Sequence, residues 1–144
     1  MSGAGKEIRA SMEDAVASPN RELRILLVSP DLLSTSRLAG LARGVPARLE
    51  TLRSLDDPAP AGPFDLVLLD THAVPADPAV SVTRLLAIVD RQRSEHGRAP
   101  RVVAFGPHVA RQRLEDARAA GADEAVSRGE LLGGFAALVK RWCG

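Results

Sequence analysis

The chain has 144 residues, a length that suits one domain and would leave two domains with cores too small to be stable. Hydrophobic residues make up 45% of the chain and charged residues 26%, a balance that excludes a wholly disordered or fibrous protein. Lys and Arg number 19 and Asp and Glu 18, so the net charge of +1 excludes a dominant surface for nucleic acids or anionic membranes.

The first 22 residues differ in composition from the rest of the chain. They combine glycine, serine and charged residues and close on Pro19-Asn20, which predicts a flexible tail over 1–22 and a single domain over 23–144. Charged residues interrupt every apolar run in this stretch, so no secretory signal is predicted. No run in the chain reaches the about 18 apolar residues of a membrane span. We therefore expect a cytoplasmic protein.

Short apolar runs, most of them bounded by polar or turn-forming residues, predict five strands. Most of these runs are apolar at consecutive positions, as in strands that are buried on both faces of a sheet. The predicted strands cover residues 24–28, 47–52, 64–70, 101–106 and 124–127.

Helices are predicted where apolar residues recur every three or four positions. Asp31 can cap the first helix, which Gly44 and Pro46 end. The segment from Asp56 to Pro63 is rich in proline and breaks regular structure, so the helix after the second strand should be shortened or missing. The other predicted helices cover residues 80–93, 109–120 and 130–142.

Strands that alternate with helices predict an α/β fold, in which helices cover both faces of a parallel sheet. Five strands in this length indicate a doubly wound, flavodoxin-like sheet with the strand order 2-1-3-4-5. In such a sheet the functional crevice lies at the carboxyl ends of the strands. The candidate residues directly follow the strands: Ser29, Pro30 and Asp31, then Asp70, Thr71 and His72, then Gly106, Pro107 and His108, and finally Ser127 and Arg128.

Three segments carry a resemblance to a known family. Residues 25–28 precede an acidic loop, residues 65–70 end on an aspartate, and residues 119–128 read Ala-Ala-Gly-Ala-Asp-Glu-Ala-Val-Ser-Arg. Over residues 24–142 the chain resembles the receiver domain of bacterial response regulators, the chemotaxis-protein-like domain of two-component signalling. The last segment is the most specific, because it is similar to the receiver stretch that leads into the fifth strand and its lysine.

The resemblance implies a role for each position at the crevice, beginning with the acids. Receivers are phosphorylated on an aspartate, and Asp70 stands at that phosphoacceptor position. The family has two adjacent metal-binding acids after the first strand, where this chain has Ser29 and Pro30. Only Asp31, one residue later, is acidic. The resemblance therefore implies that the magnesium site is largely lost.

Two further positions depart from the family pattern. Gly106 stands where receivers have a serine or threonine, and Arg128 stands where they have a lysine, which keeps the charge on a longer, planar group. The metal, the hydroxyl and the lysine all act on the transferred phosphoryl group in receivers. The combined loss of the acidic pair and the hydroxyl predicts a degenerate receiver in which Asp70 is not phosphorylated and instead binds its own loop or a cation such as Arg128.

Other chemistry at the crevice has weaker support. His72 and His108 are residue types that bind metals, and with Asp31 and Asp70 they would form a set of four. No spacing typical of metal ligands, such as His-x-x-x-His, is present, so we expect no metal. The Ser34-Thr35-Ser36 run lacks the glycine of a phosphate-binding loop, and the chain has no tyrosine and one tryptophan to stack on a flavin. No cofactor is predicted.

The leading hypothesis is therefore a phosphorylation-independent pseudo-receiver, without enzymatic activity, that binds an unknown signalling protein. One alternative is a small flavodoxin-like ligand-binding protein or enzyme that uses His72, His108, Asp70 and Arg128. Another is an atypical receiver that is phosphorylated on Asp70. A homodimer, if one forms, is expected to use the fourth helix, the fifth strand and the fifth helix, where charges of both signs occur.

Overall fold

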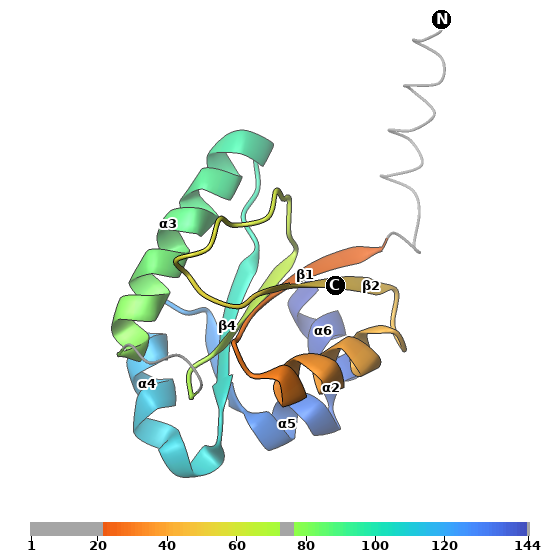
Figure 1. Cartoon of the computed structure of the whole chain (residues 1–144), viewed down its shortest axis with the longest axis vertical. Helices are drawn as coiled ribbons and strands as arrows, with labels where there is room; N and C mark the ends of the chain where they lie inside the picture. Colours follow the sequence, from red (N-terminus) through yellow and green to blue (C-terminus); the bar gives the residue numbers. More distant parts are fainter. Residues whose placement is uncertain (1–21, 73–76, 144) are drawn as a thin grey trace, which may run out of the picture.

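The structure is a computed structural model that describes residues 22–72 and 77–143. Five strands form one parallel sheet in the order β2-β1-β3-β4-β5 (Figure 1), which confirms the predicted topology. The predicted tail lies outside the described residues, apart from Glu22. The strands are β1 (Leu23–Val28), β2 (Ala47–Leu52), β3 (Leu66–Asp70), β4 (Arg101–Gly106) and β5 (Glu124–Ser127).

Helices cover both faces of the sheet (Figure 1). One core cluster lies on the face of α3 and α4 and includes Leu26 and Val28 of β1. The other lies on the face of α2, α5 and α6 and includes Ile25 and Leu27. Successive strand side chains point to opposite faces, so the unbroken apolar run in β1 supplies both cores. The helical elements are α2 (Leu32–Ala42), α3 (Pro78–His96), the 3₁₀ turn η1 (His108–Ala110), α4 (Arg111–Ala119), α5 (Arg128–Gly133) and α6 (Phe135–Cys143).

The predicted boundaries need several corrections. The helix predicted over 80–93 is longer in the structure, where α3 covers Pro78–His96. β3 begins at Leu66 rather than at residue 64, and Phe64 packs in the core ahead of the strand. The helix predicted over 109–120 begins instead as the 3₁₀ turn η1 and continues as α4. The helix predicted over 130–142 is two helices, because Gly134 is the C-cap of α5 and ends it before α6 begins.

The predicted loss of the helix after β2 is confirmed, since residues 53–65 contain neither helix nor strand. Side chains from the sheet and from α3 hold this segment in place. Arg84 donates to the carbonyl of Leu55 at 3.1 Å and contacts Asp56 at 2.7 Å. Arg24 donates to the carbonyl of Ala61 at 3.1 Å, and its guanidinium lies 4.7 Å from the centre of the Phe64 ring.

None of the helices in the described part of the chain is both long enough and apolar enough to cross a membrane.

Candidate functional site

Asp70 is the last residue of β3, and its side chain is completely buried. Its Oδ2 accepts a hydrogen bond from the hydroxyl of Ser29 at 2.9 Å, and its Oδ1 accepts one from the backbone N–H of His72 at 3.1 Å. Ser29 is also completely buried. The parallel pairing of β1 with β3 places the two residues side by side at the carboxyl edge of the sheet. The structure therefore brings together two of the predicted crevice residues.

Arg128 supplies the positive charge at this site. Its Nη2 lies 3.6 Å from Asp70 Oδ1, and its side chain is 30% exposed. A capping box between Ser127 and Glu130 begins α5 at Arg128. This start places the guanidinium over the crevice and leaves its buried Nε without a hydrogen-bond partner among the described residues. Asp70 and Arg128 are thus in contact, as the sequence suggested, and a purely structural role for the aspartate remains a prediction.

The carboxylate of Asp31 is directed to its own helix, as the capping prediction requires. It accepts hydrogen bonds from the backbone N–H groups of Leu33 and Ser34 at 3.2 and 3.3 Å and from the Ser34 hydroxyl at 2.6 Å. The Ser34 hydroxyl bond, with the two backbone bonds and the charge of Arg128, holds the pKa of Asp31 below its usual range. Asp31 is therefore a charged helix cap.

Gly106 lies in a gap that the neighbouring threonine fills. A side-chain carbon built at Gly106 would lie 2.6 Å from Thr71 Oγ1. Thr71 is completely buried, and its hydroxyl and backbone N–H both donate to the carbonyl of Phe105, at 3.1 and 2.9 Å. The crevice thus has a hydroxyl beside β4, but it comes from the residue after Asp70 and is bound to the backbone.

Sequence reasoning missed the role of Arg113. This residue of α4 donates from Nε and Nη2 to the backbone carbonyl of Thr71, at 3.0 and 2.5 Å, and so joins α4 to the loop after β3. Its partner lies 42 positions away in the sequence, and Arg113 otherwise looks like one of several surface arginines on this helix. No local pattern could have distinguished it.

The two histidines do not form a metal site with the acids. The side chains of His72 and His108 are both exposed, and His72 contributes its backbone N–H to Asp70 rather than its ring. Within residues 22–72 and 77–143 no group of three or more histidines, cysteines and acids could hold a metal ion. The set of four considered from the sequence is therefore not assembled.

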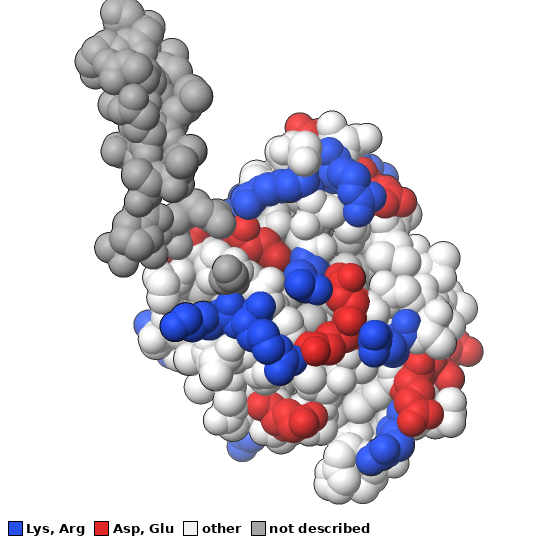
Figure 2. Space-filling view, turned by 180° about the vertical axis from the view of Figure 1, so that it is seen from behind, with Lys and Arg blue, Asp and Glu red and all other residues white. Residues whose placement is uncertain are grey.

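A hollow of about 630 Å³ lies beside the crevice, between α4, β5 and the start of α5. Its floor is partly apolar, and its rim carries both charge signs. On the face seen in Figure 2, basic and acidic side chains are likewise interspersed, in agreement with the balanced net charge. The hollow is lined by His108, Arg111, Leu114, Glu115, Arg118, Ala119, Ala125, Ser127 and Glu130.

Comparison with known proteins identifies the fold. No protein-family model matches the sequence, and no curated protein matches it. Solved structures do match. A response regulator receiver protein from Burkholderia phymatum is 23% identical with a TM-score of 0.64, over 85% of this chain and 95% of that one.

Two further structures extend this comparison. The receiver domain of Saccharomyces cerevisiae Ssk1, solved with the phosphotransfer protein Ypd1, is 10% identical with a TM-score of 0.64, over 85% of this chain and 90% of that one. Full-length ShkA in complex with AMPPNP is 20% identical with a TM-score of 0.61, over 85% of this chain but 24% of that protein. At these identities the likeness defines the fold alone: this chain has the receiver-like flavodoxin fold of two-component signalling proteins.

Proposed function

We propose that this chain is a phosphorylation-independent receiver-like domain that acts as a protein-interaction module in bacterial signalling, without cofactor or enzymatic activity. The observation that carries this proposal is the state of Asp70. Its side chain is completely buried, and both of its oxygens already accept hydrogen bonds, from Ser29 and from the backbone of His72. A phosphoacceptor carboxylate needs an accessible oxygen for in-line attack on the phosphoryl donor.

The surroundings of Asp70 support the same proposal. Phosphoryl transfer depends on positive charge and donors aimed at the transferred group, and Mg²⁺ usually supplies much of that charge. Ser29 and Pro30 offer no carboxylate for the ion, and the Asp31 carboxylate is bound to the first turn of α2. Arg128 is the cation that the described residues place at Asp70, and it compensates the existing carboxylate rather than an added phosphate.

The hollow between α4, β5 and α5 is the surface we propose for the signalling partner. Arg111 and Arg118 stand on its rim with Glu115 between them on the same helix face. No ion pair or hydrogen bond of these two arginines is found among the described residues. Unpaired charges around a partly apolar floor are typical of surfaces that bind a protein partner of complementary charge.

A second candidate function is an atypical receiver that is phosphorylated on Asp70. The observation that favours it is Arg128, whose buried Nε lacks a partner among the described residues while the guanidinium stands over the carboxylate. A phosphoryl group on Asp70 would offer that donor an acceptor oxygen.

Incubation with acetyl phosphate and Mg²⁺, followed by intact-mass spectrometry, separates the two functions. We expect no mass gain in the wild-type protein and an amide NMR spectrum that beryllofluoride leaves unchanged. A stoichiometric mass gain that Asp70→Asn abolishes would establish the second function and refute the first. Thermal-shift measurements with nucleotides, FMN and divalent ions test the remaining alternative, a ligand-binding crevice, and we expect no stabilisation.

A further inference from the structure

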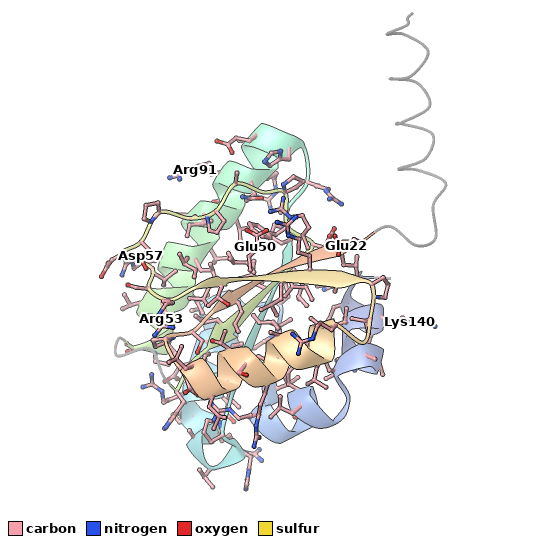
Figure 3. The ribbon with its side chains drawn as sticks, turned by 45° about the vertical axis from the view of Figure 1, so that its right-hand side comes forward. Glu22, Glu50, Arg53, Asp57, Arg91 and Lys140 are labelled. Carbon is pink, nitrogen blue, oxygen red and sulfur yellow. The ribbon has the colours of Figure 1, made fainter. Side chains whose placement is uncertain are left out.

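Among the described residues, β2 is an edge strand whose outer side pairs with no other strand. It pairs with β1 on its inner side, and no strand of the described residues lies beyond it. In Figure 3 it crosses the front of the molecule, with the labelled Glu50 beside it. The strand is six residues long, and an uncovered edge of this length presents backbone donors and acceptors that another strand can pair with.

The hydrogen bonds to β1 define which residues of β2 face outward. Leu23 N donates to the carbonyl of Pro46, and Ser29 N donates to the carbonyl of Leu52. Backbone groups of successive strand residues point in alternate directions, so the even-numbered residues of β2 bond to β1. The N–H and C=O groups of Ala47, Leu49 and Thr51 therefore point away from the sheet, although Ala47 N already donates to the carbonyl of Val45.

We propose that a second copy of this chain pairs with this edge, antiparallel, about a two-fold axis at Leu49. In that register Leu49 pairs with Leu49 of the second copy, and Ala47 pairs with Thr51. The backbone groups of Ala47, Leu49 and Thr51 face outward, so both of these pairings are hydrogen-bonded pairs of an antiparallel ladder. The two sheets would join into one continuous sheet across an isologous interface. The inference is independent of the phosphorylation state of Asp70.

The side chains of β2 are complementary in the same register. Arg48 of one copy lies directly opposite Glu50 of the other, twice by symmetry, in non-hydrogen-bonded pairs where side chains come closest. Arg48 is exposed, and Glu50 is half-buried in an ion pair with Arg24. A lone charge on an edge strand discourages pairing with another strand. In β2 the positive charge of Arg48 is instead accompanied by the negative charge of Glu50, two residues later, so the charges of the two copies match. On the other face, the two Leu49 side chains extend the core cluster that includes α2 and α6.

Because the helix after β2 is missing, no helix covers one face of β2 within the described residues. Residues 53–65 replace it as an irregular segment that Arg84 binds against α3, away from the outer side of β2 (Figure 3). A second sheet can therefore approach β2 on that face without meeting a helix. Pairing over residues 47–51 alone gives a small interface, so the dimer should be weak and visible at high protein concentration.

Sedimentation equilibrium of the full chain at low salt tests the proposal. Arg48→Glu would place two acids opposite each other at both symmetry-related pairs, and we expect the dimer dissociation constant to rise roughly tenfold or more. Arg91→Glu, an exposed charge reversal on α3, is the matched control and should leave the constant within about twofold. Circular dichroism of both variants verifies that they remain folded.

A direct structural measurement completes the test. In a mixture of isotope-labelled and unlabelled protein, the proposed register gives an intermolecular NOE between the Hα protons of Arg48 and Glu50. Sedimentation as a monomer up to millimolar concentration would overturn the proposal. So would a dimer that Arg48→Glu leaves intact and Arg118→Glu dissociates, because the contact would then lie on the α4–β5–α5 face.

Discussion

Two aspartates with buried side chains lie at opposite ends of the same central strand. Asp65 directly precedes β3, its side chain is 7% exposed, and it accepts from the backbone N–H of Arg24 at 2.8 Å while pairing with Arg98 at 3.1 Å. Asp70 ends β3, is completely buried, and pairs with Arg128 at the longer distance of 3.6 Å. Both carboxylates thus combine a backbone donor with an arginine.

The bonds of Asp65 and Asp70 indicate a different role for each carboxylate. Asp65 bonds to the start of β1 and to Arg98 before β4, so it joins framework segments at the amino end of the sheet. Asp70 adds the hydroxyl of Ser29 at the edge where this fold forms its crevice. A carboxylate with a purely structural role stabilises the fold, whereas one retained for function often costs stability. The two aspartates therefore serve as controls for each other.

The largest expected effect follows removal of each carboxylate. Asp70→Ala leaves the buried Ser29 hydroxyl without its acceptor and Arg128 without its partner, and we expect a loss of about 3 kcal/mol in the free energy of unfolding. Asp65→Ala should cost about 2 kcal/mol, since Arg98 is more exposed and easily rehydrated. Urea denaturation of both variants measures the difference.

The asparagine variants sharpen the comparison. Asp70→Asn keeps one carbonyl oxygen for the His72 N–H, and we expect a loss of only about 1 kcal/mol, with folding intact. We expect no gain from relieved repulsion between Asp70 and Asp31, because the Asp31 carboxylate is bound to its own helix. If Asp70→Asn stabilises the protein while Asp65→Asn destabilises it, the charge at Asp70 is kept for function, and the structural interpretation fails.

A smaller effect is expected for the arginine partners. Arg98→Lys and Arg128→Lys keep the charge but lose the planar group, and both side chains are partly exposed, at 47% and 30%. We expect each to cost less than about 1 kcal/mol, as for other partly exposed ion pairs. A cost for Arg128→Lys well above that for Arg98→Lys, measured by thermal unfolding in the same buffer, would mean that the Asp70 pair behaves as a buried one.

The smallest effect concerns acid stability at the two ends of the sheet. The pKa of Asp31 is lowered from 3.8, first by the Ser34 hydroxyl. Burial acts to raise the pKa of Glu124, but hydrogen bonds from Trp142 and Arg141 outweigh it and lower the pKa from 4.5. Because both folded-state pKa values are depressed, the stability they contribute is complete above the unfolded values and is lost as the pH falls below them.

Unfolding measured between pH 6 and pH 3 tests this, from well above to below the ordinary carboxyl pKa values of about 4. Glu124→Gln and Asp31→Asn should each flatten the acid decline in stability, because each removes a carboxyl whose pKa is lowered in the folded state. Asp31→Asn should change the stability at pH 6 little, because asparagine also caps helices. Equal slopes in the wild type and in both variants would contradict the assignment of these two carboxylates.

Much of the fold and part of the site could be predicted from local patterns. All five strands were predicted. Unbroken apolar runs indicated β1, β3 and β4, because a parallel sheet buries both faces of its central strands, and the proline-rich run at 56–63 indicated that the helix after β2 is missing. The Asp31 cap was likewise local, since its partners lie within three residues. The break between α5 and α6 was missed, because the apolar spacing continues through two glycines that interrupt the helix.

The sequence by itself determined the order of elements, the edge at which Ser29, Asp70 and Arg128 meet, and which positions of the resembling family have changed. Tertiary structure alone decided how those residues bond: that Thr71 fills the gap at Gly106, and that Arg113 binds the loop after β3. The physical reason is range. Strand and cap patterns express contacts between near neighbours, whereas the partners of Asp70 and Thr71 come from strands and helices as much as 58 positions apart, and their hydrogen bonds depend on how those elements pack.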